Sequence, residues 1–64
     1  MKLKDYRKLR GLTRRAVGEA LGVNQITIWR WETGRSAPRP EQARVIIAWS
    51  AGAVTAADLL GAPV

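Results

Sequence analysis

Glycine and proline divide this 64-residue chain into short segments, none of them longer than a few helical turns. The breaks fall at Gly11, Gly22, Gly34, Pro38, Pro40 and Gly52. Apolar residues between these breaks recur at helical spacing, whereas the alternation typical of strands is weak. Because glycine readily adopts the left-handed conformation that ends a helix, the pattern predicts an all-α fold, a compact bundle of four to five short helices.

Capping residues give the expected start of three of these helices. Thr13 and Asn24 are good N-caps for the second and third helix, since their side chains can accept a backbone N–H. Thr55, with Asp58 three residues later, resembles a capping box for the last helix. The helices expected from these signals run to about residue 10, then over residues 13–21, 24–33, 40 to 49 or 50, and 55–60.

Apolar spacing within these helices defines the expected core. Leu3, Tyr6 and Leu9 follow one another at intervals of three and predict one buried stripe on the first helix. Trp31 is expected in the core. Trp49 is expected either in the core or at a dimer interface.

The composition excludes several classes of protein. With no cysteine and no histidine, the chain has no disulfide, no thiolate zinc site and no imidazole general base. None of its five carboxylates forms an acid–base pair at helical spacing. We therefore expect no enzyme activity, no metal, no cofactor and no small-molecule effector. At 47% hydrophobic, residues 1–64 should fold as a single domain on packing alone.

The charge is unevenly distributed along the chain. All eleven Lys and Arg residues lie in residues 1–44 with four of the five acids, whereas residues 45–64 contain Asp58 alone. The formal net charge of +6 favours an anionic partner, with nucleic acid first and a membrane surface second. The longest internal uncharged run, residues 45–57, is too short to span a bilayer, and the N-terminus lacks the apolar core of a signal peptide. We expect a cytoplasmic protein without membrane association.

Residues 13–34 have the plan of a helix-turn-helix. The two short helices expected there are separated only by Gly22 and Val23, and in such a motif the second helix enters the DNA major groove. Gly18 fits this reading, because two helices that cross steeply need a residue without bulk at their contact. A glycine inside a helix otherwise costs about 1 kcal/mol.

A helical wheel of the third helix separates two faces. Asn24, Ile28 and Trp31 fall on the side that should face the core. The outward side carries Ile26, Trp29, Arg30 and Thr33, flanked by Gln25 and Thr27. Gln can pair with adenine and Arg with guanine, while an apolar side chain can meet a thymine methyl. We predict base reading by Gln25, Ile26, Trp29 and Arg30.

Three positions on this helix have competing interpretations. Ile26 is equally an ordinary exposed apolar residue. Trp29 can contact DNA, anchor a protein partner or pack across the edge of the helix. Glu32 falls on the buried side, where an unpaired carboxylate is costly, so it should pair with Arg7 or Arg10 of the first helix; the wheel alone does not choose between them.

The chain resembles the Cro/cI-type (XRE) family of phage-repressor-like helix-turn-helix domains over essentially its whole length. The motifs that carry the resemblance are Leu3-x-x-Tyr6-Arg7, Gly11-Leu12-Thr13, Val17, Leu21-Gly22-Val23, Ile28, Trp31-Glu32-x-Gly34, Pro38, Val54-Thr55 and Leu59-Leu60. The family fold is a lambda-repressor-like bundle, and its ion pair corresponds to Arg7 with Glu32. Two departures are Gly18, where alanine is usual, and Trp29, where many relatives carry a polar residue.

The resemblance also implies how DNA would be bound. Contacts would come from the starts of the second and third helices and from the basic loop after the third. We predict phosphate contacts from Arg14, Arg15, Asn24, Thr27, Arg35, Ser36 and Arg39.

The expected function is that of a sequence-specific transcriptional regulator. Its simplest form is a Cro-like repressor that binds double-stranded DNA at a near-palindromic operator as a homodimer, with the apolar residues 50–64 as the association region. The alternative is an antitoxin or adaptor that uses the same fold to bind a protein partner, with Trp29 and the C-terminal segment as anchors.

Overall fold

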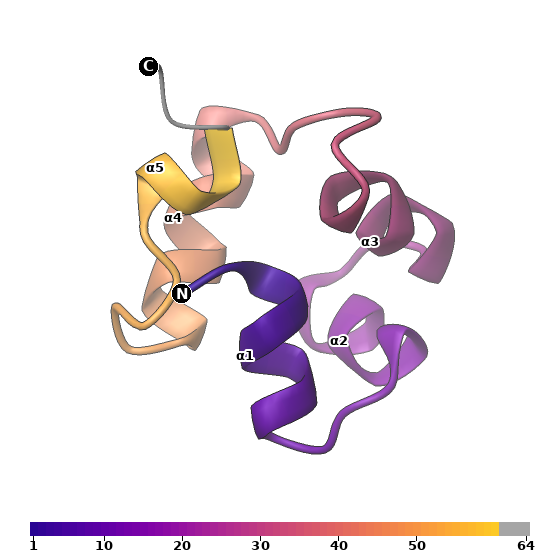
Figure 1. The fold of residues 1–64 in the computed structure, drawn as a ribbon. Coiled ribbons are helices and arrows are strands. Elements are labelled where there is room, and N and C mark those ends of the chain that lie inside the picture. Colours follow the sequence, from indigo (N-terminus) through magenta and orange to yellow (C-terminus); the bar gives the residue numbers. More distant parts are fainter. Residues whose placement is uncertain (61–64) are drawn as a thin grey trace.

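A computed structural model gives the arrangement of residues 1–60, the side chain of residue 60 excepted, and these residues form five α-helices and no strand (Figure 1). The helices are α1 (Leu3–Leu9), α2 (Arg14–Leu21), α3 (Gln25–Glu32), α4 (Pro40–Trp49) and α5 (Ala56–Leu60). The all-α prediction is confirmed. Each helix ends within two residues of its expected limit, so glycine and proline placement locates the helix ends well.

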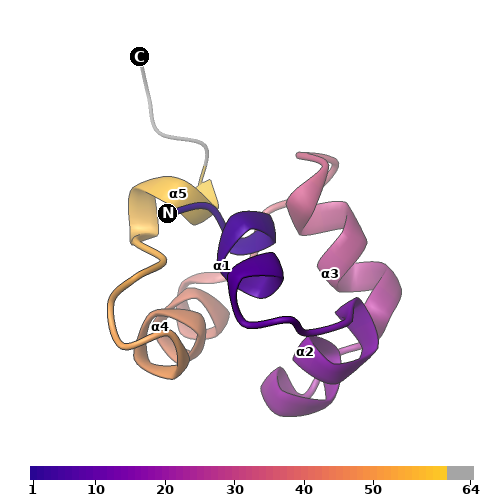
Figure 2. The ribbon, with the colours of Figure 1, turned by 60° about the horizontal axis from the view of Figure 1, so that its bottom comes forward.

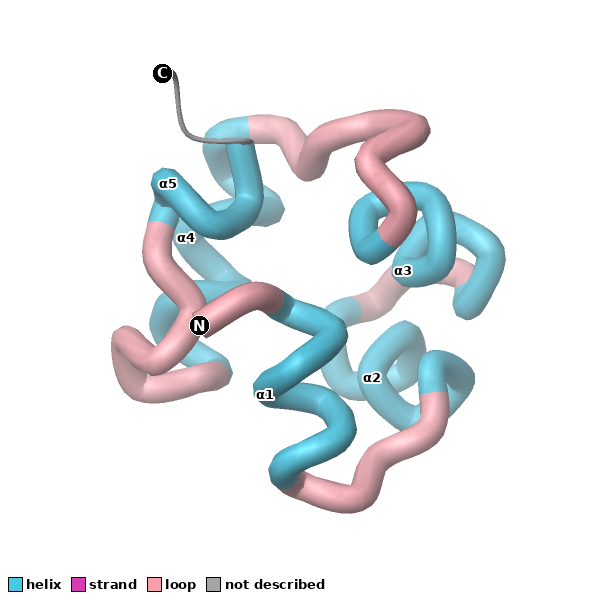
Figure 3. Tube along the Cα trace, viewed as in Figure 1, coloured by secondary structure: helices cyan, strands magenta, loops and turns pink. Residues whose placement is uncertain are grey.

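Helix α1 packs against both α3 and α4, through Arg7–Glu32 and Tyr6–Trp49. Figure 2 shows it between the pair α2 and α3 on one side and the pair α4 and α5 on the other. The loop of residues 33–39 is the longest connection and leads from α3 across to α4 (Figure 3). This arrangement leaves one side of the α2–α3 pair without a covering helix.

The core takes one fully buried side chain from each of several elements. Val17 of α2, Ile28 of α3, Ile46 of α4 and Val54 of the α4–α5 loop are all 0% exposed. Around them lie Leu3, Tyr6, Ala43 and Leu59. The core therefore joins all five helices, and α3 is anchored in it through Ile28.

The buried stripe predicted on α1 is only partly correct. Leu3 and Tyr6 are buried, but Leu9 is 68% exposed. A spacing of three falls short of the 3.6-residue turn, so Leu9 lies about 120° around the helix from Leu3. Trp31 and Trp49 are half-buried against the core, and the Trp49 ring meets the Tyr6 ring edge-on with 5.2 Å between centroids.

Local side-chain caps start three helices as predicted. The Thr13 hydroxyl accepts a hydrogen bond from the backbone N–H of Ala16 at 3.0 Å, and Asn24 Oδ1 accepts one from Ile26 N–H at 2.9 Å. Asn24 itself is exposed, not core-facing as its place on the wheel suggested. Its backbone is extended, so it lies outside the helix to which the wheel applies.

The capping box of α5 is also present. The Thr55 N–H donates to Asp58 Oδ2 and the Asp58 N–H donates to the Thr55 hydroxyl. The N-terminal ammonium of Met1 lies 2.8 Å from the same carboxylate oxygen. The ammonium first, then the N–H and the hydroxyl of Thr55, lower the pKa of Asp58 to about 2, so the carboxylate stays ionised well into acid.

Helices α2 and α3 approach so closely that only glycine fits at position 18. The buried Gly18 accepts a hydrogen bond from Val23 N–H at 2.8 Å, and a Cβ added at Gly18 would lie 2.6 Å from the Val23 carbonyl oxygen. Gly22, with a φ of 74°, ends α2 in the left-handed conformation. The turn thus needs a glycine at position 22 for its backbone conformation, and the helix crossing needs one at position 18 for space.

We predict that Gly18→Ala destabilises the protein by about 1 kcal/mol. Overpacking costs about 1–3 kcal/mol, and the atom in the way is backbone, which outweighs the gain of about 1 kcal/mol that alanine normally brings to a helix. Urea unfolding measures the difference. Ala20→Gly, at an exposed position of the same helix, gives the propensity effect alone. A Gly18→Ala variant more stable than the parent would contradict the close approach.

Candidate nucleic-acid interface

The orientation of α3 is fixed by the carboxylate of Glu32, whose side chain is 1% exposed. Arg7 Nε donates to Oε2 at 2.8 Å and Arg7 Nη2 to Oε1 at 3.3 Å. Arg14 Nε donates to Oε1 at 3.0 Å. The carboxylate therefore joins α1, α2 and α3, and the three side chains together carry a net positive charge.

Of the two arginines that the wheel allowed, Arg7 makes the pair with Glu32. Its guanidinium is completed by a hydrogen bond from Nη1 to the Leu12 carbonyl at 3.1 Å. Arg10 instead lies over the Tyr6 ring and donates from Nη1 to the Tyr6 hydroxyl at 2.9 Å. The position of the ion pair agrees with the one that the family resemblance favoured.

The face of α3 opposite the core is open. Ile28 is fully buried, whereas Gln25, Ile26, Trp29 and Arg30 are exposed, Ile26 to 54%. These four are the residues predicted to read bases. The geometry brings an amide, a guanidinium and two apolar groups onto one uncovered helix face, with the donors and the apolar surface that base edges require.

Exposed arginines lie on the elements before and after α3. Arg15 at the start of α2 is exposed and forms a loose pair with Glu19 at 3.3 Å. Arg35, Ser36 and Arg39 are exposed in the loop of residues 33–39 and at its end. Within residues 1–60, neither Arg35 nor Arg39 lies within ion-pair distance of a carboxylate.

The structure shows a contact between Arg14 and Glu32 that the sequence did not predict. The residue was predicted to bind phosphate, yet its Nε is engaged by Glu32 while its side chain remains 39% exposed. Its place directly after the N-cap Thr13 was the available signal, because it puts the side chain at the end of α2 that faces the end of α3. Arg14 thus combines an internal hydrogen bond with partial exposure at the start of α2.

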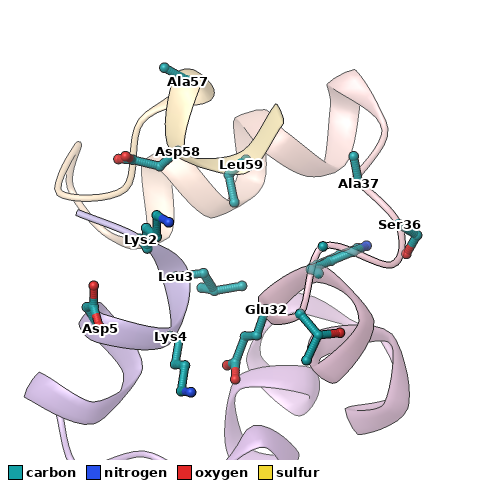
Figure 4. A pocket seen from close by; sticks show the side chains of 13 residues that line it. Lys2, Leu3, Lys4, Asp5, Glu32, Ser36, Ala37, Ala57, Asp58 and Leu59 are labelled. Carbon is teal, nitrogen blue, oxygen red and sulfur yellow. The ribbon is translucent and has the colours of Figure 1, made fainter. Parts of the chain in front are cut away.

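A groove of about 820 Å³ lies at the C-terminal end of α3, between the start of α1 and α5. Figure 4 shows Leu3 and Leu59 directed into it, with Lys2, Lys4 and Asp58 around it. Acids and lysines are mixed on its rim, so it does not extend the basic surface. Among the residues described, no three His, Cys, Asp or Glu side chains gather as metal ligands.

The fold and the open face of α3 define a class of protein. Two short helices joined by a glycine turn, the second with an uncovered polar face, make a helix-turn-helix DNA-binding domain. A family model described as "Helix-turn-helix domain" matches residues 1–64, and the chain belongs to this family. No curated protein and no solved structure matches it. None of the helices in residues 1–60 has the length and apolar character to cross a membrane.

We predict unequal roles for the two arginines that bind Glu32. Arg7→Ala should cost about 3–5 kcal/mol, because it leaves a buried carboxylate without its main partner. Arg14→Ala should cost about 1 kcal/mol or less, since its side chain is partly exposed and Arg7 remains. Guanidinium chloride unfolding measures both, with Arg15→Ala as the exposed control. Equal losses for the two variants would show that Glu32 depends on both arginines alike.

Proposed function

We propose that this protein is a sequence-specific transcriptional regulator of the Cro-like type, which represses by occupying an operator and excluding polymerase. The observation that carries the proposal is the uncovered face of α3, with exposed arginines on α2 and in the loop that follows α3. A helix presented in this way fits the major groove, and its flanking cations fit the two phosphate backbones.

Base reading is assigned to three exposed residues of α3. Gln25 in the first turn can make a bidentate pair with adenine, and Arg30 near the end can make one with guanine. Ile26 can cover a thymine methyl. Such a set discriminates bases by both hydrogen bonding and apolar contact.

Phosphate binding is assigned to the ends of the helices and the following loop. Asn24 and Thr27 lie in or next to the first turn of α3, where backbone N–H groups also favour an anion. At the start of α2, phosphate is bound by Arg15 and by the exposed part of Arg14. In the loop after α3 and at its end, it is bound by Arg35, Ser36 and Arg39.

A homodimer on a near-palindromic operator follows from the size of the reading helix. The eight residues of α3 span about 12 Å, which covers only a few base pairs. Two copies on half-sites about 34–36 Å apart give the specificity that one lacks. Association through residues 50–64 remains part of the proposal, although Val54 and Leu59 lie in the core of their own chain and residues 61–64 lie outside the described part.

The alternative, an antitoxin or adaptor with a protein partner, draws support from one observation. Ile26 and Trp29 expose apolar surface side by side on α3, Trp29 to 38%. The same face cannot bind DNA and a protein at once. DNA binding by the isolated chain therefore separates the two hypotheses.

We predict that selection from a random DNA pool by the isolated protein enriches a near-palindromic sequence bound by two copies. Sedimentation equilibrium on the winning sequence gives the stoichiometry. A protein that stays monomeric at all concentrations and on this DNA would contradict the dimer. No enrichment above the starting pool would reject the regulator in favour of the adaptor.

We predict different signatures for a base reader and a phosphate contact. Arg30→Ala should cost about 1–3 kcal/mol of binding and relax the preference at one base position. Arg39→Ala should weaken binding to all sequences alike and reduce the salt slope by about one. Titrations on the selected site and its single-base variants at several salt concentrations measure both. Arg44→Ala on α4 controls for the loss of charge, and identical behaviour of the first two variants would refute the division of roles.

A further inference from the structure

Arg35 and Trp29 form a stacked pair at the end of the α3 face. The guanidinium carbon of Arg35 lies 4.9 Å from the centroid of the Trp29 ring, within the range of a cation–π contact. The two residues are six positions apart, so continued helical geometry would not bring them together. Their contact depends on how the chain leaves α3.

The backbone at the end of α3 places Arg35 for this contact. Gly34, with a φ of 76°, reverses the chain, the Arg35 N–H donates to the Arg30 carbonyl at 2.9 Å, and the Gly34 N–H donates to the Trp31 carbonyl at 3.4 Å. These two bonds make a Schellman motif. The backbone of Arg35 is thus held by its hydrogen bond to Arg30, and its side chain by the contact with the Trp29 ring.

The charge of Arg35 remains available to an outside anion. Within residues 1–60, the carboxylate of Glu32 is engaged by Arg7 and Arg14, and no other carboxylate lies within ion-pair distance of Arg35. An indole ring holds a guanidinium without neutralising it. The stack therefore orders the side chain and leaves its N–H donors and positive charge for a phosphate.

We propose that Trp29 is a positioning residue, which holds the Arg35 guanidinium beside the α3 face so that it binds a DNA backbone phosphate next to the bases read by α3. The inference rests on the proposed function. Binding orders a flexible arginine at an entropic cost, and an arginine already stacked on Trp29 loses less freedom on binding. This role replaces base reading by Trp29.

A double-mutant cycle on the selected DNA tests the proposal, with Trp29→Leu, Arg35→Ala and the double variant titrated at several salt concentrations. Arg35→Ala should reduce the salt slope by about one. Trp29→Leu should weaken binding about two- to fivefold, the scale of an exposed cation–π contact, with unchanged base preference. The double variant should bind no more weakly than Arg35→Ala. Trp29→Phe, which keeps an aromatic face, should restore most of the affinity.

The other outcomes overturn the inference in distinguishable ways. Additive losses in the cycle would mean that the two residues act separately. A changed base preference in Trp29→Leu would make Trp29 a reader. Thermal unfolding of each variant shows whether a weaker binding affinity comes only from a less stable fold. In that case Trp29→Phe would bind less DNA as well, and the inference would fail. A parent protein that binds no DNA would reject the proposed function itself.

Discussion

The structure depends above all on one buried carboxylate. Glu32 is 1% exposed, and an ionised carboxylate withdrawn from water this far is costly unless several donors replace the lost hydration. Arg7 and Arg14 supply three N–H donors from two different helices. Because both reach the same group, they tie α1 and α2 to the end of α3, in an orientation that turns the face with Gln25 and Arg30 outward.

A domain of this size needs such a polar tie because its apolar core is small. Chains of about 60 residues bury only about 60% of the surface that they expose when unfolded. Packing and hydrogen bonding act here on the same pair of helices. Gly18 lets α2 approach the turn at Val23 until backbone meets backbone, and the Arg14–Glu32 bond joins the other ends of the two helices. The angle between α2 and α3 is thereby determined at both ends.

The sequence could predict the caps and helix limits, which depend on near neighbours along the chain. The caps by Thr13 and Asn24 were predicted because a cap needs only a side-chain oxygen and an N–H two or three residues away. Leu9 was misplaced because its spacing was treated as a full turn. The contact of Arg14 with Glu32 and that of Arg35 with Trp29 were missed, since the first depends on the packing of two helices and the second on the path of the chain after Gly34.

Four of the arginines fall into two groups according to these contacts. Arg7 and Arg14 serve the interior, whereas Arg30 and Arg35 belong to the end of α3 and, within residues 1–60, have no carboxylate partner. The two are linked through the backbone, because the Arg30 carbonyl accepts the Arg35 N–H. The residue proposed to read a base and the residue proposed to bind a phosphate are thus connected through the turn at Gly34. If the proposed roles hold, a change that relaxes this turn disturbs both contacts together, although Gly34 itself carries no side chain.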